Sequence, residues 1–146
     1  DRVDDALHAT KAALEEGILP GGGAALLYAS NGLNDNSIGY RIVKNACRKP
    51  FNQILVNAGY ENTRAEMLAI DLCSSGDGYW TGYDLSRGIT VNMEEAGILD
   101  PTKVTVTALE NAASVAGTIL LTECVVVDHP EIKDPVPETS APIMNM

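Results

Sequence analysis

GILDPTKVTVTALENAASVAGTI, residues 97–119, is the stretch with the clearest helical signal in the chain. Asp100 is a typical N-cap residue, and Pro101 suits the first helical position because its missing N–H would have no helical partner there. Apolar residues then recur at helical spacing as far as Ile119. The stretch therefore predicts a long helix that begins at Asp100 and Pro101.

The sequence before this stretch also favours helices. Residues 1–16 carry an apolar stripe that includes Val3, Leu7 and Leu14, and Gly17 is placed to end that helix. Pro50 is expected in the first turn of a separate helix. Further helices are predicted at residues 24–29, 38–47 and 50–58, and from Asn62 onward. The predicted fold class is therefore mainly α.

Two segments have β character instead. Glycines interrupt aromatic and β-branched residues between residues 74 and 91, a pattern typical of a β-hairpin or ribbon. Cys124–Val127 reads as a C-terminal edge strand. Residues 129–146 hold four of the seven prolines among polar residues, and we expect them to form a disordered tail.

The charge balance restricts the partners. The 146 residues carry 10 Lys and Arg against 20 Asp and Glu, a formal net charge of −10. Such a chain is poorly suited to bind nucleic acid or an anionic membrane surface, although a nucleotide carried with its own Mg²⁺ remains possible. No apolar stretch approaches the roughly 18–20 residues of a membrane span.

Cysteine and histidine are sparse. The three cysteines form no CxxC pair and the chain has two histidines, so we expect neither a disulfide framework nor a metal site. The chain opens with an acidic helical pattern rather than a basic segment and an apolar run, which indicates no secretory signal. Because the first residue is not Met, we expect the C-terminal piece of a longer chain.

Three polar features could carry chemistry. Asp5 lies on the polar face of the first predicted helix, which is either a solvated acidic face or the wall of a cleft where a carboxylate handles a water proton. The run from Pro20 to Gly23 is either a tight interhelical turn or a place where backbone N–H groups approach a ligand. Asp100 is either a helix cap or a ribose-binding carboxylate.

Two long blocks of the sequence resemble GroEL-type (group I) chaperonins. The first is DRVDDALHATKAALEEGILPGGG at residues 1–23, and the second is GILDPTKV at residues 97–104, continued by NAASVAG at 111–117 and TEC at 122–124. The resemblance implies that residues 1–15 end an intermediate domain and that residues 16–128 form the C-terminal half of an equatorial, nucleotide-binding helical domain. The tail departs from the family, which commonly ends in a Gly-Gly-Met repeat.

The resemblance also implies roles in an ATP site. Asp5 matches the catalytic aspartate that orients or deprotonates the water attacking the γ-phosphate, and Asp100 matches the aspartate that binds the ribose. The remaining nucleotide-binding positions are Gly21, Gly22, Asp84, Leu85, Ser86 and Ile98. The family usually has Asn where this chain has Asp84. The phosphate loop and the Mg²⁺ ligands of the family lie upstream of these residues.

The function implied is that of an ATP-driven chaperonin, an ATPase that forms a homo-oligomeric ring of seven subunits and encloses unfolded polypeptides, with a possible co-chaperonin. The Cys124–Val127 strand would pair with a neighbouring subunit. These residues alone should not hydrolyse ATP, because the phosphate and Mg²⁺ half of the site is missing. The implied location is a bacterial or phage-infected cytoplasm, or an organelle matrix. The alternative is a chaperonin-derived assembly module without ATPase activity.

Overall fold

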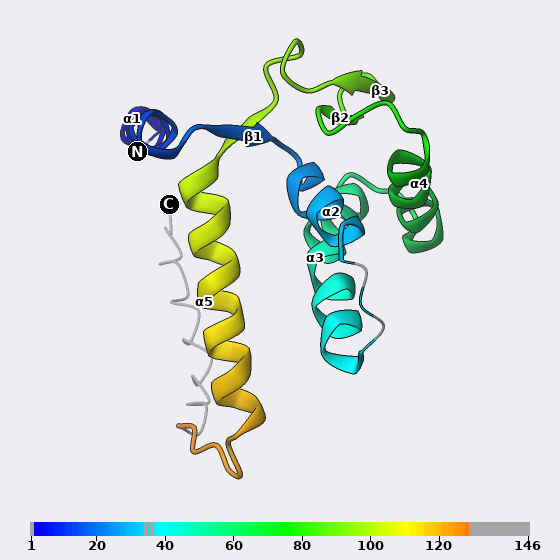
Figure 1. Ribbon diagram of the computed structural model, residues 1–146. Coiled ribbons are helices and arrows are strands. Elements are labelled where there is room, and N and C mark those ends of the chain that lie inside the picture. The colour runs from blue at the N-terminus through cyan, green and yellow to red at the C-terminus, as the bar shows by residue number, and fades with distance from the viewer. Residues whose placement is uncertain (1, 34, 36, 129–146) are drawn as a thin grey trace, which may run out of the picture.

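The computed structural model describes residues 2–33, 35 and 37–128, so the predicted tail at 129–146 lies outside the described residues. Helices dominate the described chain, and two short antiparallel sheets join them (Figure 1). The elements are α1 (Arg2–Glu16), β1 (Ile18–Pro20), α2 (Ala24–Asn31), α3 (Ile38–Asn57), α4 (Asn62–Ser74), β2 (Thr81–Asp84), β3 (Ile89–Asn92), β4 (Leu99–Pro101) and α5 (Thr102–Leu120). The prediction of a mainly α fold is confirmed.

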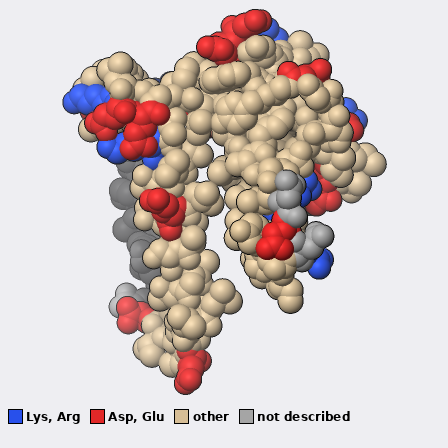
Figure 2. Space-filling view, viewed as in Figure 1, with Lys and Arg blue, Asp and Glu red and all other residues tan. Residues whose placement is uncertain are grey.

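The hydrophobic core lies among α2, α3 and α4. Its buried residues come from all three helices: Leu27, Phe51, Leu55, Ala65, Ala69 and Leu72. The long helix α5 stands apart from this core and packs against α1 and β4 (Figure 1). It has no buried residue, and its surface in Figure 2 is mostly uncharged. No helix in the described ranges is long and apolar enough to cross a membrane.

A two-stranded ribbon of β1 and β4 connects the two parts of the molecule. Ile18 pairs with Pro101, Leu19 with Asp100 and Pro20 with Leu99. The ribbon was not predicted, because three-residue strands give no periodic signal. The prediction that Asp100 caps the last helix is wrong, because Asp100 belongs to β4 and Pro101 occupies the N-cap position without a side-chain bond.

The prediction of separate helices at residues 38–47 and 50–58 is wrong. Residues 38–57 form one helix that continues through Pro50, where two helices were expected. Cys47, Phe51 and Leu55 are buried at a four-residue spacing on both sides of Pro50, so packing against α2 and α4 holds the helix together despite the hydrogen bond that proline cannot donate.

The β-hairpin is confirmed as β2 and β3, which pair from Thr81–Asn92 to Asp84–Ile89. The C-terminal edge strand is wrong for this structure, since residues 124–128 have no regular secondary structure. Val125, Val126 and Val127 are exposed, and a strand cannot form without a partner to accept and donate its ladder hydrogen bonds.

Candidate functional site

The hairpin cavity is a hollow of about 320 Å³ between the glycine turn, α3 and the β2–β3 turn. It brings together five of the residues predicted for the nucleotide site. These are Gly22, Asp84, Leu85, Ser86 and Ile98. The remaining lining residues are Phe51, Ile54, Leu55 and Tyr83. Most of this lining is apolar, so the cavity suits a flat, weakly polar group with hydrogen-bonding groups at one edge.

The glycine turn lies where the ribbon meets the helical core. The Gly21 N–H donates to the Ile98 carbonyl at 2.9 Å, which extends the ribbon by one bond toward the cavity. Gly22 and Gly23 have φ values of +63° and +78°. A Cβ on Gly23 would lie 2.7 Å from the Phe51 nitrogen. Glycine is therefore required for α2 to start this close to α3.

The buried Asp84 side chain shapes the hairpin turn. Its Oδ1 accepts hydrogen bonds from the Ser86 hydroxyl at 2.6 Å, the Ser86 N–H at 2.8 Å and the Arg87 N–H at 3.3 Å. Arg87 Nε lies 3.5 Å from Oδ2. The pKa of Asp84 is lowered chiefly by the hydrogen bond from the Ser86 hydroxyl. The two backbone N–H groups and the charge of Arg87 lower it further, whereas burial opposes them. Asp84 thus holds Leu85 and Ser86 at the cavity wall.

Acid should weaken this turn. Because the pKa of Asp84 is lowered on folding, its contribution to stability is present above the unfolded value of about 3.9 and is lost as the pH falls through the folded value. We expect urea midpoints of the intact protein to drop more between about pH 5 and pH 2.5 than those of Asp84→Asn, whose amide still accepts hydrogen bonds but cannot titrate. Equal drops would contradict this role.

A tyrosine pair supports the same wall. The Tyr83 hydroxyl donates to the Gly88 carbonyl at 2.9 Å, so Tyr60, 3.2 Å away, donates to Tyr83. The rings meet edge to face at 6.0 Å, and the Arg64 guanidinium lies 5.9 Å from the Tyr60 ring centre. The pair ties the hairpin to the α3–α4 connection. Sequence reasoning missed it, because two tyrosines this far apart carry no recognisable motif.

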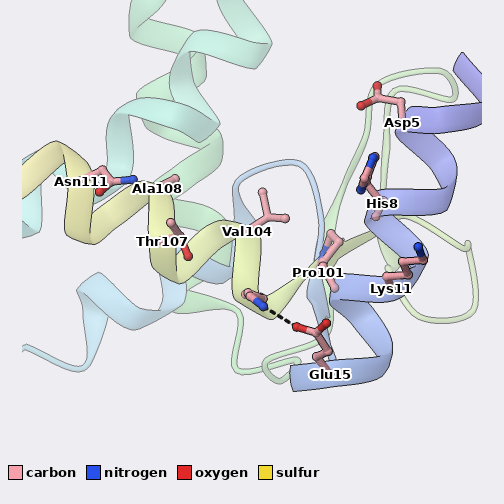
Figure 3. A pocket seen from close by; sticks show the side chains of 12 residues that line it. Asp5, His8, Lys11, Glu15, Pro101, Val104, Thr107, Ala108 and Asn111 are labelled. Atoms are coloured by element: carbon pink, nitrogen blue, oxygen red, sulfur yellow. Dashed lines mark hydrogen bonds and ion pairs between the residues drawn. The ribbon is translucent and has the colours of Figure 1, made fainter. Parts of the chain in front are cut away.

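Asp5 lies in a different hollow, the α1–α5 cleft of about 730 Å³ (Figure 3). In Figure 3, Asp5, His8 and Lys11 project from α1 on the side of Pro101 and Val104. The polar face of α1 thus lines a cleft, although Asp5 itself remains exposed. The predicted apolar stripe faces outward instead: Val3 is 81% exposed and Leu14 is 82% exposed. Lys103 contacts Glu15, and both residues line the cleft.

Asp100 lies between the two hollows. Its neighbour Pro101 lines the α1–α5 cleft, and Ile98 lines the hairpin cavity. Burial raises the pKa of the half-buried Asp100 carboxyl. Within the described part of the chain, this carboxylate has no hydrogen-bond or ion-pair partner. A half-buried carboxylate without a donor is costly, and a bound hydroxyl group would offset that cost.

The predicted residues therefore do not share one cavity. Five line the hairpin cavity, Gly21 joins it through its bond to Ile98, Asp5 lines the α1–α5 cleft, and Asp100 stands between them. Among the residues that the structure describes, no three His, Cys, Asp or Glu side chains are placed to hold a metal ion.

Comparisons with known proteins identify the family of the chain. Residues 1–130 match the sequence model of the TCP-1/cpn60 chaperonin family. A solved structure entitled "Crystal structure of group III chaperonin in the open state" matches with a TM-score of 0.70 and 28% sequence identity. The match covers 79% of this chain and 25% of that chain, so this chain spans about a quarter of the length of that chaperonin. The chain belongs to the TCP-1/cpn60 chaperonin family.

Proposed function

We propose that these residues supply the adenosine-binding and water-activating part of an ATP-dependent chaperonin that encloses unfolded polypeptides and assists their folding. The observation that carries this proposal is the hairpin cavity, where the glycine turn, the β2–β3 turn and Ile98 meet from three separate segments of the chain. The β1–β4 ribbon links that cavity to the cleft that contains Asp5.

The residues present fit the adenosine half of ATP. The apolar side chains of Phe51, Ile54 and Leu55 suit one face of a base, and Asp84 fixes the turn that borders it. Asp100 follows the lining residue Ile98 by two positions, and its half-buried carboxylate is free to accept hydrogen bonds from ribose hydroxyls. The volume of about 320 Å³ is at the lower end for ligand sites, which suits a nucleoside rather than the whole nucleotide.

Asp5 is proposed to orient and deprotonate the attacking water. Its carboxylate is exposed on the cleft side of α1, where a proton acceptor can reach a bound water. Phosphoryl transfer depends chiefly on positioning and on neutralising the phosphates, and bound Mg²⁺ supplies part of that neutralisation. We place the Mg²⁺ ligands and the phosphate loop in residues upstream of this chain, so these residues alone should be inactive.

The affinity for ATP tests the site. In the intact protein that contains these residues, we expect Asp100→Ala to raise the dissociation constant of MgATP roughly 5- to 150-fold, equivalent to about 1–3 kcal/mol, because the ribose hydroxyls lose their acceptor. Asp100→Asn should recover part of the loss. Asp71→Ala, which removes an exposed carboxylate from α4, is the matched control. Calorimetric titration with MgATP measures all three variants.

Two outcomes would count against the proposal. An unchanged dissociation constant in Asp100→Ala would remove Asp100 from the site. Absence of any ATP binding by the intact protein would favour the alternative, a chaperonin-derived assembly module without ATPase activity.

The type of ring is a separate part of the proposal. The two sequence blocks resemble group I chaperonins, which implies seven subunits in each ring and a possible co-chaperonin, whereas the matching solved structure is of a group III chaperonin. An electron-microscopy class average of the intact protein would count the subunits directly.

A further inference from the structure

A second pocket, the α3–α4 pocket, lies between those two helices and has a volume of about 420 Å³. Four side chains that can form hydrogen bonds line it from α3: Asn45, Arg48, Lys49 and Asn52. On the α4 side, Glu66 joins two apolar residues. None of these residues lines the hairpin cavity or the α1–α5 cleft. The proposed ATPase function does not use this pocket.

The pocket is locally positive in an acidic protein. Helix α3 carries Arg41, Lys44, Arg48 and Lys49 and contains no Asp or Glu. Within the described residues, neither Arg48 nor Lys49 has a carboxylate within ion-pair distance. The positive charges of α3 also act on α4. Burial raises the pKa of the Cys73 thiol there, and the charges of Arg48 and Lys44 partly oppose that rise. Two unpaired cations beside one pocket favour an anionic occupant.

Two buried atoms define the hydrogen bonds that such an occupant must make. Arg48 Nε is a donor and Asn52 Oδ1 is an acceptor, and within the described part of the chain neither has a hydrogen-bond partner although solvent does not reach either atom. The two residues lie one helical turn apart on the face that lines the pocket. Buried polar groups in native proteins are nearly always paired. An occupant that pairs with both atoms must therefore accept one hydrogen bond and donate another.

We propose that the α3–α4 pocket binds hydrogenphosphate. The unprotonated oxygens would accept from Arg48 and Lys49, and the P–OH group would donate to Asn52 Oδ1. Glu66 supports this choice, because its carboxylate repels a fully deprotonated anion more than one that carries a proton. A water molecule would leave both cations unneutralised. Sulfate has the same shape and charge but carries no proton to donate at neutral pH.

Titration of the nucleotide-free intact protein with inorganic phosphate at pH 7 tests the proposal. We expect a dissociation constant in the millimolar range or below, and at least tenfold weaker binding of sulfate at the same ionic strength. Arg48→Met should weaken phosphate binding at least tenfold. Asn52→Leu should weaken phosphate binding more than sulfate binding, because it removes the acceptor for the P–OH group. Circular dichroism and thermal melting check that each variant is folded.

Controls separate this site from the nucleotide site and from general attraction. Lys44→Met removes the same charge from α3 at a position that does not line the pocket, and it should leave phosphate affinity within about twofold. Lys49→Met, at an exposed position, should weaken binding even if Arg48→Met fails to fold. Phosphate bound at the nucleotide site, whose phosphate loop we place upstream of this chain, would not respond to Lys49→Met. Equal binding of sulfate and phosphate, or an equal loss in Lys44→Met and Lys49→Met, would overturn the proposal.

Discussion

Replacing Asp5 with alanine in the intact chaperonin is expected to lower the rate of ATP hydrolysis by about 10²- to 10⁴-fold, the usual contribution of a positioned proton acceptor. The affinity for MgATP should stay within about threefold of the wild type, because Asp5 lies in the α1–α5 cleft and does not line the hairpin cavity. The change should therefore separate turnover from binding.

Steady-state hydrolysis and equilibrium binding of MgATP, measured on the same preparations, check this expectation. Asp4→Ala is the matched control, because it removes the adjacent carboxylate of α1 and Asp4 does not line the cleft. Asp5→Asn distinguishes two roles: an amide can orient water but cannot take its proton, so general-base action predicts a loss as large as in Asp5→Ala. Loss of binding with a normal rate per bound ATP would defeat the role given to Asp5.

Replacing Gly23 with alanine is expected to destabilise the protein by about 2–5 kcal/mol. A left-handed backbone costs a residue with a Cβ about 1–2 kcal/mol, and forced displacement of a packed neighbour adds roughly 1–3 kcal/mol. Both costs apply at Gly23, whose φ is +78° and whose Cβ would lie 2.7 Å from the nitrogen and 2.9 Å from the Cα of Phe51. Backbone atoms inside a helix cannot move aside as the end of a side chain can.

Gly59→Ala isolates the first of these costs. Gly59 has a φ of +92°, and a Cβ there would meet nothing within 4 Å. We expect Gly59→Ala to cost about 1–2 kcal/mol, clearly less than Gly23→Ala. Urea unfolding of the intact protein, followed by circular dichroism, gives both values. Equal costs for the two variants would show that α2 and α3 can separate without loss of packing.

Periodicity predicted most helices correctly, and its failures have physical causes. The stripe of Cys47, Phe51 and Leu55 crosses Pro50 without a break, and its burial outweighs the tendency of proline to end a helix. At the start of α5, two good capping signals were present, yet pairing with Leu19 placed Asp100 in a strand. Local preferences could not reveal that pairing, because its partner lies far away along the chain.

The resemblance to the chaperonin family indicated the candidate site residues, and the structure gives their positions. Spacing alone left the polar face of α1 open to two interpretations, and only the position of α5 shows that Asp5 faces a cleft. Asp84 was expected among the nucleotide-binding positions, and in the structure its Oδ1 accepts three bonds from its own turn. The nucleotide role of these residues stays a prediction. The tyrosine pair could not be predicted, because it depends on how the hairpin approaches α4.

The β1–β4 ribbon has a consequence for the order of folding. Helices α2, α3 and α4 and the β2–β3 hairpin are joined by contacts between neighbouring segments, whereas Ile18 and Pro101 can pair only after the whole intervening chain has become compact. Closing that large loop costs entropy that no local contact repays. We therefore expect the ribbon to form late, so that a nascent chain acquires a stable helical core before it acquires a completed binding site.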